Sequence, residues 1–349
     1  MKLIVTIDTE EDNWARYSAT DNPVTNIERI PALQSLFDEY GVRPTYLVSY
    51  PVATNPRSVE ILRSILEQGK CEIGMHCHPW NTPPLEEKAA IRGRDTMLCN
   101  LPDNLIREKI AFLHYTISEN FGITPVSFRA GRWGFSATAA DALCDLGYKV
   151  ESSVTPFVSW LGYQGPDYSD FGPDWFRFGS KGLEVQNNTD PLLEVPVSIG
   201  FLQPGQEGCR HLAKALKNSL ARRLHIGGVL ERMKLLNLVW LSPEMSSVQE
   251  MTALAGRMRK NGCAFLNLTF HSTSLKAGLS PFVQSAADGD LFWKKLSYFF
   301  SAAREAGWKS LTLTELEKTT SPRRQEPPSS VAAGTLSESS QVKGVGQCS

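Results

Sequence analysis

Acidic and histidine residues that could do chemistry follow two short apolar runs of the sequence. Asp8 and Glu10 stand in the acid cluster after the run Leu3–Ile7, and His76 and His78 end or follow a later run. Residues two apart on a strand point to the same face, so the two imidazoles could bind one divalent cation. The acids could complete such a site, although an acid cluster at this position could equally cap a helix.

Two further residues stand at the ends of predicted strands. Arg129 ends the run Val126–Arg129 and could hold a carboxylate through paired hydrogen bonds. His271 follows the run Cys263–Phe270, and its ordinary pKa near neutrality suits a general acid. Taken singly, a surface arginine and a buried structural histidine would explain both residues. Their shared position directly after strands favours one site instead.

Strand-like and helix-like segments alternate along the chain, which favours a parallel sheet with crossover helices. A barrel fits better than an open dinucleotide-binding sheet, because no glycine-rich loop follows the first strand. In a barrel, carboxyl ends of strands meet at one mouth, where active sites are built. The predicted strands are Leu3–Ile7, Pro44–Ser49, Cys71–His76, Val126–Arg129, Lys149–Ser153, Leu192–Val197, Cys263–Phe270 and Ser310–Leu313. The predicted helices are Ile27–Tyr40, Ser58–Gln68, Asp103–Phe121, Ala137–Leu146, Ser247–Asn261 and Gly289–Ala306.

Composition limits the classes of function. The chain has 349 residues and a net charge of −1, so no global positive field indicates nucleic acid as a partner. No apolar stretch approaches the length of a membrane span, and the first strand is too short for a signal-peptide core, which predicts a cytoplasmic protein. We expect one domain over residues 1–320. Residues 321–349 are polar and rich in Pro, Ser and Gly, which predicts a disordered tail.

Two segments interrupt the alternation of strands and helices. Residues 157–178 are rich in aromatic side chains, which could stack on sugar rings or simply pack the segment against the barrel. Residues 207–241 include a basic amphipathic stretch, which we interpret as a solvated helix face.

The order of these residues resembles the polysaccharide deacetylase superfamily of carbohydrate esterases. Thr6-Ile7-Asp8-Thr9 resembles its first motif, Gly74-Met75-His76-Cys77-His78 the front half of its second, and Arg129 to Gly134 its third. An acid at a strand end, Glu151, stands for the fourth, and Thr269-Phe270-His271 resembles the fifth. The resemblance spans about Lys2 to Leu316 and implies a distorted (β/α)7 TIM-like barrel.

The resemblance also implies a set of roles. Asp8 would be the base that takes the proton of water, Arg129 its partner, His271 the acid and His76 a metal ligand. The chain departs from the family at Thr9, where the family has a metal-binding Asp. It departs again at Trp80, where the family has its second His. His78 could replace that His, and the missing carboxylate could come from Asp8 itself, Glu10 or Asp12.

The predicted function is a metal-dependent hydrolase that removes acetyl groups from an N- or O-acetylated sugar or glycan precursor, in surface polysaccharide metabolism. The expected cofactor is a divalent metal ion, zinc first, held by Asp8, Glu10, His76 and His78. We expect Trp80, Arg132, Trp133 and Glu151 to contact the sugar. Two alternatives stay open, a metal-free amidohydrolase on the same fold and a non-catalytic glycan-binding protein. Oligomeric state stays open too.

Overall fold

The computed structural model describes residues 1–12, 14, 16–85, 91–216 and 236–320. The strands are β1 (Lys2–Thr9), β2 (Thr45–Val48), β3 (Glu72–Cys77), β4 (Ser127–Ala130), β5 (Val150–Glu151), β6 (Phe176–Gly179), β7 (Gly182–Gln186), β8 (Leu192–Glu194), β9 (Ile199–Phe201), β10 (Leu238–Trp240), β11 (Phe265–His271) and β12 (Lys309–Ser310). Ten of these form one sheet in the order β11-β1-β2-β3-β4-β5-β8-β6-β7, with β12 beside the start of β1. Strands β9 and β10 form a separate antiparallel pair.

Seven neighbouring strands of the large sheet, from β11 to β8, run parallel, as the alternation of segments predicts. The two outer strands of this array are linked by the residues that follow β8. The Ser198 amide donates to the Asn267 carbonyl of β11 at 3.0 Å, and the Ser198 hydroxyl accepts from the Asn267 amide at 2.8 Å. The seven strands therefore curve into a barrel whose last junction is made by hydrogen bonds between Asn267 and residues 195–198.

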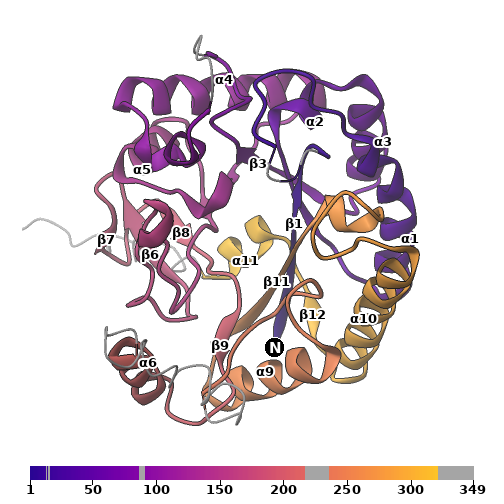
Figure 1. Cartoon of the computed structure of the whole chain (residues 1–349), viewed down its shortest axis with the longest axis vertical. Helices are drawn as coiled ribbons and strands as arrows, with labels where there is room; N and C mark the ends of the chain where they lie inside the picture. Colours follow the sequence, from indigo (N-terminus) through magenta and orange to yellow (C-terminus); the bar gives the residue numbers. More distant parts are fainter. Residues whose placement is uncertain (13, 15, 86–90, 217–235, 321–349) are drawn as a thin grey trace, which may run out of the picture.

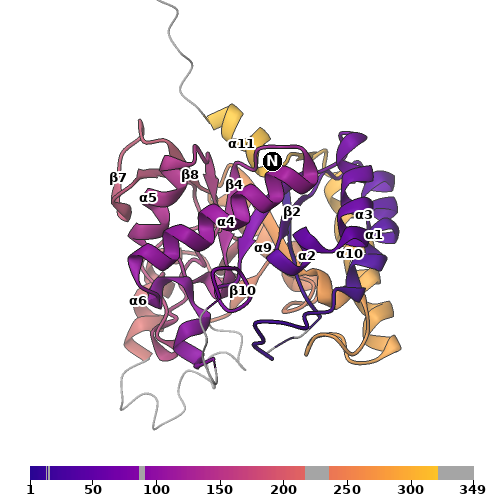
Figure 2. The same cartoon turned by 90° about the horizontal axis from the view of Figure 1, so that it is seen from above.

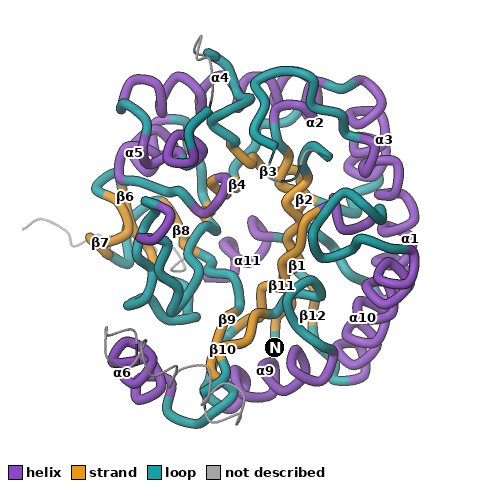
Figure 3. Tube along the Cα trace, in the orientation of Figure 1, coloured by secondary structure: helices purple, strands orange, loops and turns teal. Residues whose placement is uncertain are grey.

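Helices surround the strands (Figure 1, Figure 3). Their bounds are α1 (Ile30–Tyr40), α2 (Tyr50–Thr54), α3 (Pro56–Glu67), α4 (Asp103–Phe121), α5 (Ala137–Asp145), α6 (Gln206–Leu216), α9 (Val248–Lys260), α10 (Ala286–Glu305) and α11 (Leu313–Thr320). The main core lies between the outward side chains of the strands, such as Val5 and Ile7, and the helices. Burying this apolar surface is the chief force that holds the fold together.

The inside of the barrel is layered. Ile4, Leu47, Val150 and Phe265 come from four different strands and share one buried apolar cluster. Leu313 and Leu316 of α11 belong to the same cluster, and Figure 2 shows α11 beside the amino terminus. Helix α11 thus closes the amino-terminal end of the barrel. In the described part of the chain, the carboxyl ends of the strands form the open end of the barrel.

The structure adds elements that the sequence patterns do not predict. Strands β6 and β7 form an antiparallel hairpin at the end of the sheet, and α2 precedes α3. The basic segment 207–241 lies partly in α6 and β10, and its residues 217–235 lie outside the described part, as does the predicted tail 321–349. None of the described helices is long and apolar enough to cross a membrane.

Candidate metal and catalytic site

A cavity of about 590 Å³ opens at the carboxyl ends of the strands. Its floor carries Asp8 and Glu10 from β1 and the loop after it, His76 and His78 from β3 and its end, and His271 from β11. The inward face of β1 continues past its last residue, so Glu10 lies on the same side as Asp8. Five residues singled out from the sequence therefore surround one space.

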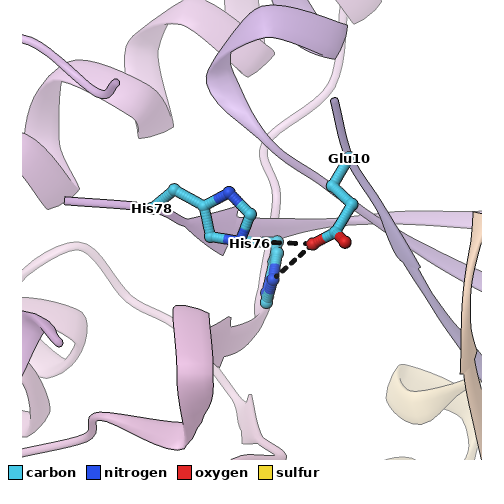
Figure 4. Close-up of side chains that lie close together, drawn as sticks. All are labelled: Glu10, His76 and His78. Carbon is cyan, nitrogen blue, oxygen red and sulfur yellow. Dashed lines mark ion pairs between the residues drawn. The ribbon is translucent and has the colours of Figure 1, made fainter. Parts of the chain in front are cut away.

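Glu10, His76 and His78 form a buried group whose ligand atoms all lie within 4.8 Å of one another. The Glu10 Oε2 atom is 3.6 Å from Nε2 of His76 and 3.3 Å from Nε2 of His78, as drawn in Figure 4. Ligands about 2.1 Å from a tetrahedral zinc ion stand about 3.4 Å apart. The spacing of this group therefore fits a small divalent cation.

Hydrogen bonds on the far side of each imidazole leave Nε2 available. The Nδ1 atom of His76 lies 3.1 Å from the Arg129 carbonyl, which can only accept, so Nδ1 carries the proton. The Nδ1 atom of His78 lies 2.9 Å from Glu11 Oε1. Such outer partners fix the orientation of metal-binding histidines.

Glu11 is the centre of a second polar group behind His78. Besides His78, its Oε1 accepts from Asn81 at 2.7 Å and from Trp80 Nε1 at 3.2 Å, and its Oε2 accepts from Ser49. Burial lowers the pKa of His78, but Glu11 and Glu10 outweigh it and raise that pKa to about 10. A cation would compete with the proton that His78 gains from this raised pKa, since a ligand must be deprotonated to bind metal.

The backbone of the Arg129–Gly134 motif passes close to the His78 imidazole. A Cβ atom at Gly131 would lie 2.5 Å from His78 Cδ2 and 2.7 Å from the Cys77 carbonyl oxygen. Both distances are shorter than real Cβ contacts allow. Glycine at this position is therefore needed for the chain to pass so close to the imidazole.

Asp8 has a different partner. Arg129 Nη1 donates to Asp8 Oδ1 at 2.6 Å, and both side chains are buried. Burial raises the pKa of Asp8, but Arg129, His76 and His271 outweigh it and hold that pKa below its ordinary value. Asp8 is thus an ionised carboxylate beside the candidate metal group and is not one of its three members.

Arg129 itself is held on all sides. It donates to the Ser152 carbonyl, the Ser152 hydroxyl, Thr6 and Thr269 at 2.7–3.0 Å. These partners form a polar layer above the apolar layer of the barrel interior. The guanidinium therefore fixes Asp8 in position as well as neutralising it.

His271 stands across from the metal group and pairs with Glu244. Its Nδ1 lies 2.9 Å from Glu244 Oε2, and its Nε2 lies 3.8 Å from Asp8 Oδ2. Burial lowers the pKa of His271, but Glu244, Glu10 and Asp8 raise it to about 10. His271 is therefore protonated at neutral pH and can donate a proton from Nε2.

Aromatic side chains form the walls of the cavity. Trp133, Trp160, Tyr163 and Trp240 line it, so part of the aromatic insertion 157–178 does face the cavity. Trp80 lines it as well, but its ring stacks on His78 with centroids 4.1 Å apart. Flat aromatic faces of this kind suit a sugar ring or another flat apolar ligand.

Two residues that the sequence offered for the site, Glu151 and Asp12, lie elsewhere. Glu151 is fully buried on the other side of the sheet beside Glu194, burial raises the pKa of both, and it does not line the cavity. Glu151 therefore lies outside the cavity in which a substrate would bind, which does not fit the expected contact with the sugar. Asp12 accepts from the Thr25 and Asn26 amides and so orders the loop after β1. Thr9, next to Asp8, is buried and donates to the Ile7 carbonyl.

Two residues of the site, Glu11 and Glu244, were not assigned a role from the sequence. Glu11 belongs to the predicted acid cluster, but its partners come from other strands. Glu244 follows β10, which has only three residues and no recognisable pattern.

Solved structures of polysaccharide deacetylases share this architecture. A protein assigned as a polysaccharide deacetylase from Mycobacterium smegmatis superposes with a TM-score of 0.53 at 15% identity, covering 96% of this chain and 94% of that one. A protein assigned as a glycoside hydrolase or deacetylase from Parabacteroides distasonis gives 0.54 at 11% identity, with 91% and 70% covered. The chain shares the fold of these two structures.

The fold alone does not identify the reaction. A 4-alpha-glucanotransferase from Thermococcus litoralis also superposes, with a TM-score of 0.50 at 12% identity over 93% of this chain and 41% of that one. No family model and no curated protein matches the chain by sequence. One fold can carry several reactions, so the function has to be argued from the residues of the cavity.

Proposed function

We propose that the protein is a metal-dependent hydrolase that removes an acetyl group from an N- or O-acetylated sugar. One observation carries the proposal. The Glu10, His76 and His78 group lies in the same cavity as an ionised carboxylate, Asp8, and a protonated imidazole, His271. A hydrolase of this kind needs these three components.

The residues present fit zinc. Two imidazoles and one carboxylate are a ligand set of catalytic zinc sites, which keep a further position open for water or substrate. When bound, the cation would lower the pKa of a water molecule and polarise the acyl carbonyl. The outer partners of His76 and His78 support the assignment, because they keep both Nε2 atoms directed at one point.

Asp8 and His271 would handle the protons of the reaction. Water attacks the acyl carbon while Asp8 Oδ2 accepts its proton, and Arg129 keeps Asp8 Oδ1 occupied so that the other oxygen is the free one. The bond from the acyl carbon to the sugar nitrogen or oxygen then breaks. His271 Nε2 gives its proton to this leaving atom, and Glu244 stabilises the imidazolium that supplies it.

The two alternatives make different demands on the site. A metal-free amidohydrolase would gain nothing from two Nε2 atoms and a carboxylate converging within 4.8 Å. A non-catalytic glycan-binding protein would use the aromatic walls but would not need the buried pairs Asp8–Arg129 and His271–Glu244, which are costly to bury. The geometry therefore favours the metal-dependent hydrolase. A cytoplasmic location and a role in surface polysaccharide metabolism stay predictions.

The test is release of acetate from acetylated oligosaccharides by the purified full-length protein. We expect turnover with N-acetylated or O-acetylated substrates, loss of turnover after chelation, and recovery on addition of zinc. Turnover that resists chelation and gains nothing from added metal would support the metal-free alternative. Binding of the sugars without any release of acetate at saturating zinc would support the non-catalytic one.

A further inference from the structure

Arg132 differs from the other cations of the cavity because it has no acidic partner in the described part of the chain. It lines the cavity and is half-buried. Its Nη1 donates to the Thr96 hydroxyl and, at 3.4 Å, to the Gly93 carbonyl, both neutral acceptors. No hydrogen bond from Nε or Nη2 to a described residue is formed. One edge of the guanidinium, with two parallel N–H groups, is therefore not used by any described residue.

The carboxylates of the cavity are already paired. Asp8 contacts Arg129, Glu11 contacts His78, and Glu244 contacts His271. Glu10 faces both His76 and His78. No described acidic side chain therefore forms an ion pair with Arg132.

The local backbone and packing hold Arg132 in its position. Arg132 and Trp133 have φ values of +53° and +62°, a left-handed conformation that costs energy for residues with a side chain. The guanidinium lies over the ring of Tyr17, 5.4 Å from its centroid. Tyr17 in turn contacts Trp80, which stacks on His78. Arg132 and His78 therefore line the same cavity and are linked by three successive ring contacts of 5.4, 5.0 and 4.1 Å.

We propose that Arg132 binds an anionic group of the substrate, so that the protein prefers an acidic sugar to a neutral one. A guanidinium edge with two parallel N–H groups matches two oxygens of a carboxylate or of a phosphate. The anion would sit on a sugar unit next to the acetylated one. This inference rests on the proposed function for the identity of the ligand as an acetylated sugar.

The experiment uses three N-acetylated disaccharides that differ only in the second sugar, which is a neutral hexose, a hexuronic acid or a hexose 6-phosphate. Affinities are measured by calorimetry on the zinc-loaded full-length protein, and acetate release is followed in parallel. The two acidic probes distinguish a carboxylate from a phosphate as the preferred anion. We expect the unaltered protein to bind at least one of them about 10- to 100-fold more tightly than the neutral probe.

Arg132→Gln should abolish this preference, so that the ratio of neutral to acidic Kd falls to about one, whereas Arg132→Lys, which keeps the charge but loses the fork, should recover part of it. The matched control is Arg94→Gln, on the neighbouring turn, where Arg94 is exposed, pairs with Asp95 and does not line the cavity. That change should leave the ratio as it is. Equal affinity for all three probes in the unaltered protein, or an unchanged ratio in Arg132→Gln, would overturn the inference. An acidic preference without acetate release would support Arg132 as the anion site while contradicting the proposed hydrolysis.

Discussion

Asp8 and Glu10 lie two residues apart at the end of β1, on the same inward side, and yet contact different partners. Asp8 is held by Arg129 at 2.6 Å, and Glu10 lies 3.3 and 3.6 Å from the Nε2 atoms of His78 and His76. In the proposed mechanism, this division of partners assigns the role of base to Asp8 and that of metal ligand to Glu10. It also accounts for Thr9, since a carboxylate is available one residue later.

Asp8→Asn should therefore lower turnover by about 10²–10⁴-fold with little change in metal content, because an amide of the same shape cannot accept the proton of water. Acetate release and metal analysis on the same sample check this. Joint loss of metal and turnover would instead assign Asp8 to the metal.

The pKa of His271 should control the alkaline limit of activity. Glu244 contributes most to raising that pKa to about 10, so Glu244→Gln should lower it. Because the protonated form is the proton donor, the alkaline limb of the kcat/KM profile should move to lower pH. Ser274→Ala, which removes a neutral donor to Glu244 and a hydroxyl contact with Ser280, is the matched control and should leave the limb in place. A Glu244→Gln profile that overlays the unaltered one would contradict this assignment.

Arg129 should be essential for stability as well as for positioning. Arg129→Met leaves Asp8 buried without its cation, which should cost about 3–5 kcal/mol of unfolding free energy. Adding Asp8→Asn removes that charge, so the double variant should regain part of the loss. Urea unfolding of the single and double variants measures this. A double variant as unstable as the sum of the two single ones would show that the pair is not coupled.

Glu11 should increase the affinity for the metal without binding the metal itself. Glu11→Gln weakens the acceptor that orients His78, and we expect metal affinity to fall about 10- to 100-fold. Zinc competition with a chromophoric chelator measures the affinity. Glu151→Gln is the control, since Glu151 is equally buried but lies outside the cavity. Equal effects of both changes would indicate a general loss of folding rather than an effect on His78.

Much of the barrel could be predicted because its patterns are local. Helix α4 begins and ends at the predicted residues Asp103 and Phe121, and the parallel pairing follows from the alternation of strands and helices. The ends of β1, β3, β4 and β11 were predictable for the same reason, and these ends carry Asp8, His76, Arg129 and His271. A rule that looks for polar residues after strands therefore locates most of the site.

The remaining features depend on contacts between distant segments. Glu244 meets His271 only because the loop after β10 folds against β11, and a strand of three residues leaves no periodic signal. The two faces of β5 also have opposite environments. Glu151 packs outside the barrel with Glu194, whereas the next residue, Ser152, contacts Arg129 inside it. Which face of a two-residue strand points inward cannot be read from so short a pattern.

The metal content of the protein shows whether Glu10, His76 and His78 hold a cation. Zinc bound after reconstitution and removal of excess should be measured on the unaltered chain, on Glu10→Gln and on Asp8→Asn. We expect one tightly bound zinc per chain in the unaltered protein and in Asp8→Asn, and loss of it in Glu10→Gln. An unaltered protein that turns over substrate without bound metal, or a Glu10→Gln variant that keeps its zinc, would show that Glu10 does not complete a catalytic metal site.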